Sequence, residues 1–226
     1  MDPRFVTDYA VSSFPFSFIL GYNTDVIGDA EPQSWNDLFD IEKFPGQRAF
    51  YKWSSPGALE IALLADGVAP ADLYPLDLDR AFAKLDTIKD HIVWWGGGAQ
   101  SQQLIASGET PLGMFWDMRL WPLQASGMPV KIQWNENLLS VDALVIPKGA
   151  PNKDLAMKFL AKVATPEGQK TFMDIITSEE VEGGVAGGGN VQTLPEGGAN
   201  QIALGNDWWG KNRDMIAERW YAWQAK

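Results

Sequence analysis

Hydrophobic and polar positions along this chain follow two patterns that alternate. Short apolar runs rich in aromatic and β-branched residues predict buried strands, at 11–22, 48–53, 92–95, 111–116, 130–134 and 143–147. Between these runs, apolar residues recur at helical spacing. The helices predicted in this way cover 34–39 (a capped turn), 56–66, 79–89, 99–107, a segment from Asp117, 152–163 and 166–176. Strands that alternate with helices favour an α/β fold with a largely parallel sheet.

Cap and breaker residues mark the ends of several elements. Ser55 is a capping residue and Pro56 a first-turn proline, so a helix is expected to begin there, and Gly67 is expected to close it. Pro122 is expected to interrupt or kink the helix that begins at Asp117.

The C-terminal part of the chain divides into a glycine-rich stretch and a helix. Residues 182–198 contain seven glycines and no apolar period, which is typical of a flexible linker or loop. From Asn206 the helical period returns, and Trp209, Ile216, Trp220 and Trp223 lie on one helical face. This face is expected to dock onto the rest of the protein.

Charge and composition exclude several classes of function. There are 18 Lys and Arg against 29 Asp and Glu, a net charge of −11, which disfavours nucleic acid and anionic membranes and is compatible with a cationic small ligand. The chain has no cysteine and one histidine, His91, so thiol catalysis and multi-histidine metal sites are excluded. No metal or cofactor is expected.

The N-terminus and the hydropathy indicate in which compartment the protein is expected. No run of about 20 apolar residues occurs, so no membrane span is expected. The opening residues, Met1 to Arg4, do not form a signal peptide. The expectation is therefore either a cytosolic protein or a chain without its export signal.

Several stretches together resemble a known family. They are FILGYNTDVI at 18–27, SWNDLFDIEKFPGQRAF at 34–50, ALEIALLADGV at 58–68, GETPLGMFWDMRLW at 108–121 and DALVIPKGAPNKDLAMKFLAKVATPEGQKTF at 142–172. In order and spacing they are similar to the extracellular solute-binding proteins of bacterial ABC importers, most of all to the spermidine/putrescine-binding branch. The ending NDWWGKNRDMIAERWYAW resembles the C-terminal helix of that branch.

The resemblance implies a fold, a partner and a location. The fold would be one lobe of a type II periplasmic binding protein, a mainly parallel sheet flanked by helices, with most of the N-terminal lobe lacking. The implied division is a second-lobe domain at 11–141, a return crossing with helices of the first lobe at 142–181, a linker at 182–198 and a docking helix at 199–226. It also implies a periplasmic or extracellular setting and an ABC transporter permease as partner.

Candidate binding residues lie where an α/β sheet receives ligands, outside the carboxyl ends of strands and at helix N-termini. The candidates are Trp116, Asp117, Trp53, Ser54, Trp95, Gln100 and Asp142. An indole face attracts an ammonium group, and an ionised carboxylate accepts its hydrogen bonds. The backbone N–H groups from Gly97 to Gln100 suit a carboxylate or a phosphate, although a tight turn alone would explain the glycines.

The resemblance assigns roles to two of these candidates. Trp116 matches the aromatic wall of polyamine-binding relatives, and Asp142 matches their amine-binding carboxylate. Each also has a structural interpretation, as a core tryptophan and as a hinge or turn residue, and Asp117 has one as a helix cap. Trp53 and Ser54 stand where those relatives have acidic residues, and the next carboxylate is Glu60. The ligand is therefore expected to be a polyamine or another small amine.

Two other functions stay open at this point. One is a scaffold lobe that binds nothing tightly and pairs with itself as a homodimer through exposed apolar surface. The other is a carbohydrate-active enzyme, for which Glu179-Glu180 or Asp77 and Asp79 would supply paired acids. Because these acids lie in polar turns, the sequence favours a protein that is not an enzyme.

Overall fold

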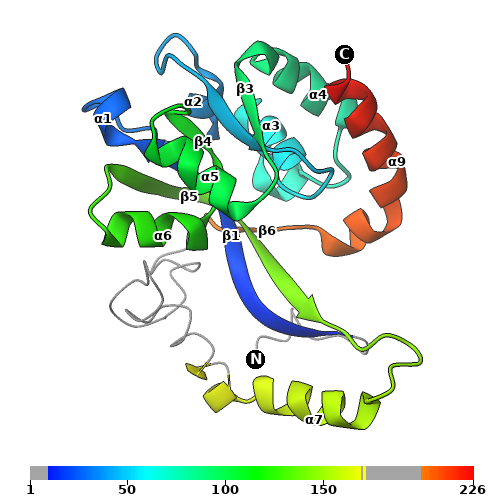
Figure 1. Ribbon diagram of the computed structural model, residues 1–226. Coiled ribbons are helices and arrows are strands. Elements are labelled where there is room, and N and C mark those ends of the chain that lie inside the picture. Colours follow the sequence, from blue (N-terminus) through cyan, green and yellow to red (C-terminus); the bar gives the residue numbers. More distant parts are fainter. Residues whose placement is uncertain (1–9, 169, 172–199) are drawn as a thin grey trace.

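One six-stranded sheet forms the centre of the protein. The computed structural model describes residues 10–168, 170–171 and 200–226. The strands are β1 (Val11–Asn23), β2 (Arg48–Tyr51), β3 (Ile92–Trp95), β4 (Leu112–Trp116), β5 (Val130–Leu144) and β6 (Ile202–Ala203). They are arranged in the order β3-β2-β4-β1-β5-β6 (Figure 1).

The sheet is mixed in direction. β2 runs parallel to β3 and β4, and β6 runs parallel to β5. β1 is antiparallel to both of its neighbours, β4 and β5. The α/β class is thus confirmed, while the two longest strands form an antiparallel ladder. Apolar periodicity identifies a strand but does not give its direction.

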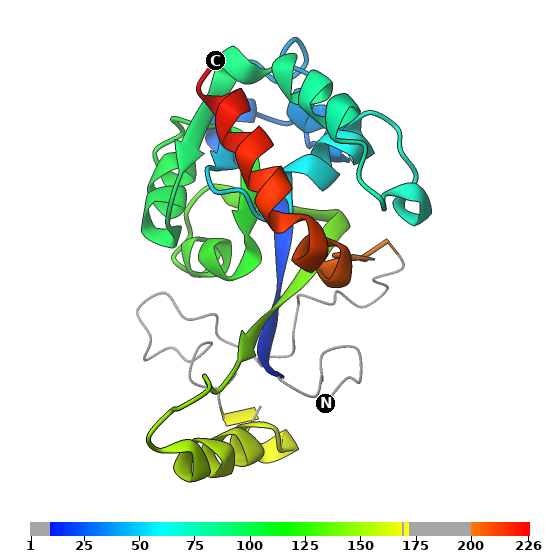
Figure 2. The same ribbon diagram turned by 90° about the vertical axis from the view of Figure 1, so that its right-hand side faces the viewer.

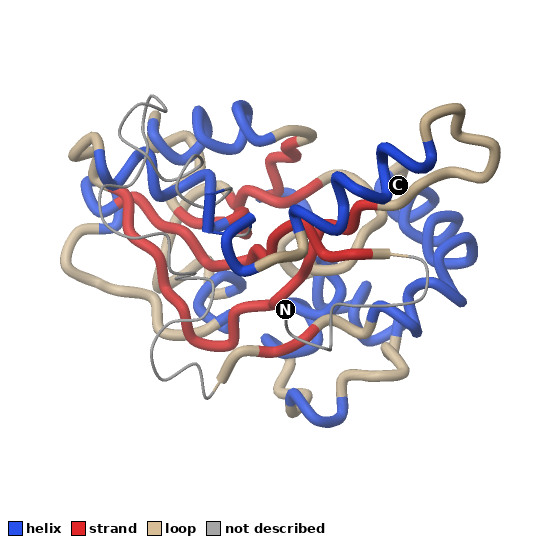
Figure 3. Tube along the Cα trace, turned by 90° about the horizontal axis from the view of Figure 1, so that it is seen from below, coloured by secondary structure: helices blue, strands red, loops and turns tan. Residues whose placement is uncertain are grey.

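Helices cover both faces of the sheet (Figure 3). The helices of the described residues are α1 (Thr24–Ile27), α2 (Trp35–Phe39), α3 (Ala58–Ala65), α4 (Leu78–Asp86), α5 (Gly98–Ala106), α6 (Asp117–Ala125), α7 (Lys153–Val163), which lies away from the sheet (Figure 1), and α9 (Asn206–Gln224). The main core lies between the sheet and the layer of α2, α3, α4 and α9. A smaller core lies between the sheet and α5 and α6.

The two cores arise from the period of two along each strand. On β4, Met114 belongs to the main core and Phe115 to the smaller one. On β1, Phe18 and Leu20 face the main core, while Ile19 between them faces the smaller one. Successive side chains of a strand point to opposite faces, so apolar runs on these strands supply both layers.

Most of the expected elements are present with shifted ends. The predicted strand at 130–134 and the first two residues of the one at 143–147 lie on β5, which extends without interruption to Leu144, while residues 145–147 are not in a strand. Pro122 lies inside α6. Of the helix expected at 166–176, residues 166–168 and 170–171 are helical. The glycine-rich stretch 182–198 lies outside the described residues.

A two-stranded ribbon leaves the sheet and carries α7. Beyond the sheet, β1 and β5 continue as a pair, and α7 follows β5 at a distance from the other helices (Figures 1 and 2). The ribbon begins at a bulge, because Leu20 pairs with Gln133 while Phe18 pairs with Leu138. α7 buries none of its residues. The described part of the chain contains no helix that is both long and apolar enough to cross a membrane.

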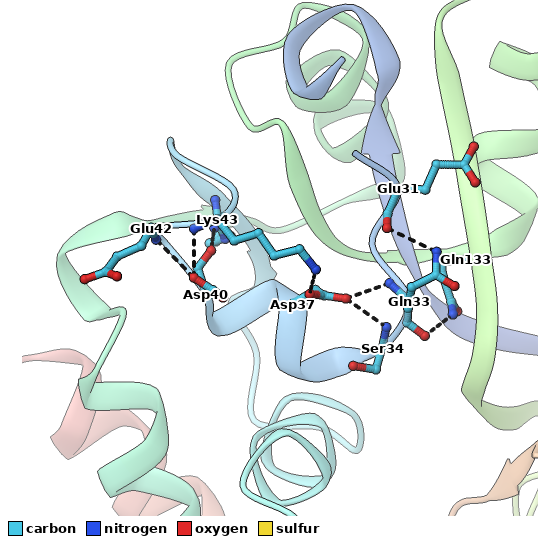
Figure 4. Close-up of polar contacts among 9 residues, drawn as sticks. Glu31, Gln33, Ser34, Asp37, Asp40, Glu42, Lys43 and Gln133 are labelled. Atoms are coloured by element: carbon cyan, nitrogen blue, oxygen red, sulfur yellow. Dashed lines mark hydrogen bonds and ion pairs between the residues drawn. The ribbon is translucent and has the colours of Figure 1, made fainter. Parts of the chain in front are cut away.

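α2 is fixed to the sheet by a polar network (Figure 4). The Asp37 carboxylate accepts hydrogen bonds from the backbone N–H groups of Gln33 (2.7 Å) and Ser34 (3.3 Å) and pairs with the Lys43 ammonium group at 2.8 Å. Burial acts to raise the pKa of Asp37, but these partners outweigh it and hold the pKa below its usual value. The side chain of Gln133 on β5 donates to the Gln33 carbonyl group.

α9 docks by the face that the sequence indicates. Trp209, Ile216, Trp220 and Trp223 are all buried. The Trp220 indole donates to the Lys52 carbonyl at 2.9 Å, and the Trp223 indole donates to Asp86 on α4 at 2.6 Å. The interpretation of these residues as a docking stripe is therefore confirmed.

Candidate functional site

Trp116 ends β4 and immediately precedes α6. Its ring is half-buried and touches the rings of four aromatic residues, at centroid distances of 6.3 Å (Phe16), 6.5 Å (Phe18), 5.2 Å (Tyr51) and 4.9 Å (Trp95). These contacts hold the indole in one orientation while leaving part of it accessible. Its buried N–H group has no hydrogen-bond partner among the described residues.

Asp117, the residue after Trp116, is buried. Its side chain is completely inaccessible, and one carboxylate oxygen accepts the Met118 N–H at 2.7 Å. Burial raises the pKa of Asp117 to about 7, against the opposing effect of backbone N–H donors. Asp117 is the first residue of α6, and the N-cap position is occupied by Trp116, so the interpretation of Asp117 as the helix N-cap is wrong by one position.

Trp95 lies in the core, with its ring in contact with the ring of Trp116. It has no exposed surface, and its indole N–H donates to the Met114 carbonyl at 3.1 Å. Its ring stacks on Phe115 and meets Trp116 edge to face. In this structure it has no surface from which to touch a solute directly.

Asp142 lies on the ribbon, on the same face of the sheet as Trp116. On β1, Phe18 pairs with Trp116 of β4 on one side and with Leu138 of β5 on the other. Two positions away Phe16 pairs with Ser140, and four positions away Phe14 pairs with Asp142. Directly paired residues share a face, as do residues two apart on one strand. Trp116 and Asp142 thus share a face, separated by about 13 Å along β1. Asp142 is exposed, and partial burial raises its pKa.

Trp53 and Ser54 lie on the loop between β2 and α3. The Trp53 ring is 46% exposed, and the Lys52 ammonium group lies 4.4 Å from its centroid. Ser54 lines a pocket of about 280 Å³ between this loop and α9, together with Ser55, Pro56, Trp209, Gly210 and Arg213.

Gln100, in the first turn of α5, is hydrogen-bonded through its side chain to the backbone of the glycine turn that precedes it. Its side-chain oxygen accepts the Gly96 N–H at 2.9 Å, and its amide nitrogen donates to the Trp94 carbonyl at 3.3 Å. Trp53 donates to the Gly96 carbonyl at 3.3 Å, so these two candidates meet at the same turn. Gln100 is exposed but is already engaged with the backbone.

Two cations beside this turn were missed by sequence reasoning. A Cβ atom at Gly96 would overlap the end of the Lys52 side chain, and one at Gly98 would overlap the Arg119 guanidinium group. The absence of side chains lets both cations lie against the turn. Arg119 is exposed and has no ion-pair partner among the described residues. The spacing of Arg119, one helical turn after Trp116, was the available signal.

Apart from Asp142, which lies on the ribbon, the candidate residues form three groups. Trp116, Asp117 and Trp95 lie together at the end of β4, with Arg119 one turn along α6. Trp53 and Gln100 meet at Gly96, whereas Ser54 belongs to the pocket beside α9. The described residues contain no cluster of acids and histidine that could hold a metal ion.

Comparison with known protein families gives one match over most of the chain. A family model described as bacterial extracellular solute-binding protein matches residues 6–179. The gamma-aminobutyric acid-binding protein of Pseudomonas aeruginosa is 32% identical over 99% of this chain and 66% of its own length. The spermidine/putrescine-binding periplasmic protein of Salmonella typhimurium is 24% identical over 77% of this chain and 49% of its own length.

A solved structure shows the same fold. The Atu4243-GABA receptor superimposes with a TM-score of 0.88 and 52% sequence identity, over all of this chain and 72% of that one. The chain thus spans about half to two thirds of the curated relatives that it matches. These relatives are solute-binding proteins rather than enzymes, as expected from the sequence.

Proposed function

Because the chain belongs to the family of bacterial extracellular solute-binding proteins, we propose that it recognises a small amine-bearing solute for an ABC importer. The observation that carries the proposal is the placement of an aromatic side chain and a carboxylate on one face of the sheet, near in sequence to a cation without an ion-pair partner among the described residues. Trp116 and Asp142 share one face of the sheet, and Arg119 lies one helical turn from Trp116. In this proposal an importer permease is the partner and the periplasm is the place of action.

The amine end of the solute is assigned to Trp116 and Asp142. An ammonium group over an indole face gains about 0.5–2 kcal/mol. Because four aromatic neighbours hold the Trp116 ring, little conformational entropy is lost when a solute binds it. The Asp142 carboxylate on the same face supplies the opposite charge and accepts charge-assisted hydrogen bonds.

Arg119 favours a solute that also carries a carboxylate. A guanidinium group binds a carboxylate through two parallel hydrogen bonds, and it repels a second ammonium group. Lys52 adds a positive charge on the same glycine turn. We therefore propose an ω-amino acid of the γ-aminobutyrate type as the solute. The relative that is 32% identical over 99% of this chain is a gamma-aminobutyric acid-binding protein, which supports this choice.

A diamine such as putrescine is the second candidate. The net charge of −11 favours a dication, and one relative is named for spermidine and putrescine. The two candidates make opposite predictions for Arg119, because this side chain attracts the carboxylate of an amino acid and repels the second amine of a diamine.

Calorimetric titration of this chain with γ-aminobutyrate and with putrescine tests the proposal. Trp116→Ala should weaken binding of γ-aminobutyrate about 2- to 30-fold, the equivalent of the ammonium–indole energy. Arg119→Met should weaken γ-aminobutyrate at least tenfold and leave putrescine unchanged or tighter. Lys131→Met, which removes a surface cation paired with Glu31, is the charge control and should change neither.

The outcomes separate the candidates. If the protein binds putrescine but not γ-aminobutyrate, and if Arg119→Met does not change that binding, the solute is a diamine and not an amino acid. No heat and no rise in melting temperature with either solute at millimolar concentration would refute the proposed function.

A further inference from the structure

The junction between β4 and α6 contains a buried carboxyl group that is only half satisfied. Asp117 has no exposed surface, and one of its oxygens accepts the Met118 N–H at 2.7 Å. Its other oxygen, Oδ2, has no hydrogen-bond partner among the described residues. The buried indole N–H of the preceding residue, Trp116, has none either. An ionised carboxylate that is only partly hydrogen-bonded is costly to bury, so this site disfavours the charged form.

The surroundings of Asp117 contain few charges that could offset this cost. The elements packed against α6 are α5, β1, β4 and β5. α5 and β4 carry no titratable side chain. The other titratable groups of these elements and of α6 itself are Tyr22, Lys131, Glu136, Asp142 and Arg119. Burial is the main cause that raises the pKa of Asp117 to about 7, and only backbone hydrogen bonds oppose it. The carboxyl group is therefore about half protonated at neutral pH.

We infer that binding of an amine-bearing solute beside Trp116 is coupled to the loss of a proton from Asp117. The inference rests on the proposed function. An ammonium group on the Trp116 indole places a positive charge on the residue that directly precedes the buried carboxyl group, and this charge favours the ionised form of Asp117. By linkage, the same interaction makes the ionised protein bind the solute more tightly than the protonated protein.

Proton release can be counted on the unmodified chain. Calorimetry with γ-aminobutyrate at pH 7, in two buffers that differ in ionisation enthalpy, should show about half a proton released per solute bound, since about half of the Asp117 carboxyl groups are protonated at that pH. The dissociation constant should fall about tenfold between pH 6 and pH 8. Neither charge of γ-aminobutyrate titrates over this interval, so the slope belongs to the protein.

Two variants test whether the released proton comes from Asp117. Asp117→Asn should bind with an affinity that is independent of pH and close to that of the original chain at pH 6, and should release no proton. His91→Gln, which removes the only imidazole of the chain, should keep both the slope and the proton release.

Three results would contradict the inference in distinguishable ways. A flat pH profile with normal binding overturns the coupling and leaves the proposed function intact. A slope that survives in Asp117→Asn assigns the proton to another group, such as Asp142, and also overturns it. If no binding occurs at any pH, the proposed function fails as well. Should Asp117→Asn not fold, the proton count on the unmodified chain decides.

Discussion

A single buried carboxylate, that of Glu60, joins three separate parts of the chain. One oxygen accepts the Gly57 N–H at 2.8 Å at the start of α3. The other accepts the Tyr74 hydroxyl and the Trp209 indole N–H, each at 2.6 Å. From the sequence, Glu60 is the first carboxylate after the Trp53-Ser54 candidates. The structure turns it inward, where it holds α9 against α3 instead of facing a solute.

Glu60→Gln should destabilise the folded protein by about 1–3 kcal/mol, because the amide group offers an N–H to neighbours that are themselves donors. Thermal unfolding measures this as a lower Tm. Glu109→Gln, on an exposed turn, is the matched control and should leave the Tm unchanged. Equal Tm values for the original chain and Glu60→Gln would contradict the assigned role of the carboxylate.

The effect of Glu60→Gln should also depend on pH. Burial is the largest influence on Glu60 and raises its pKa above the usual value. A group whose pKa is raised on folding stabilises the folded state most below its unfolded pKa, and this contribution is lost as the pH rises through the folded pKa. The difference in unfolding free energy between the original chain and Glu60→Gln should therefore shrink from pH 4 upward. Chemical denaturation at several pH values would show a constant or growing difference if the carboxylate were ionised throughout.

At the scale of elements, α9 depends on a few large apolar contacts. Trp220 is 1% exposed, and its ring lies 5.7 Å from that of Trp94 and 5.5 Å from that of Trp223. Its indole N–H also donates to the Lys52 carbonyl group. α9 therefore packs against both β3 and α4, although about 110 residues or more separate it from either in sequence.

Trp220→Ala should lower the free energy of unfolding by about 3–5 kcal/mol, because a cavity replaces a fully buried ring. The next residue, Tyr221, is 44% exposed, and Tyr221→Ala should cost less than about 1 kcal/mol. Denaturant unfolding compares the two variants directly. Similar losses for both would mean that α9 is not held by its buried face.

At the scale of the whole molecule, α7 and the ribbon expose apolar surface away from the sheet. Leu155, Met157 and Phe159 on α7 are 69%, 53% and 60% exposed, and Val145 at the end of the ribbon is 60% exposed. Large apolar side chains gathered in this way favour association. The homodimer that the sequence raises as a possibility would use this surface, and it stays a prediction. The division of the chain at 141/142 also stays a prediction.

The double variant Leu155→Glu with Phe159→Glu should reduce self-association of this chain without unfolding it, because α7 buries none of its residues. Sedimentation velocity over a range of concentrations measures the association, and circular dichroism checks the fold. Leu63→Glu, at a buried position of α3, should instead unfold the protein. Unchanged sedimentation of the double variant would place the association surface elsewhere or show that there is none.

The sequence by itself determined the local elements and one buried face. Strands and helices lie close to their expected ranges, because apolar period and cap residues act over a few neighbouring positions. The docking face of α9 was readable for the same reason, since residues four apart on one helix share a face. The family was also readable, from stretches such as DALVIPKGAPNKDLAMKFL at 142–160.

Only the tertiary structure decided strand direction and which aromatic and charged residues reach the surface. Trp95 and Trp116 both end apolar strands, yet Trp95 is fully buried and Trp116 is not, because Phe115 covers the Trp95 ring. Arg119 became a candidate only when the first turn of α6 was seen against the glycine turn of α5. Burial and charge placement depend on segments that are far apart in sequence, and no local pattern records which of them will meet.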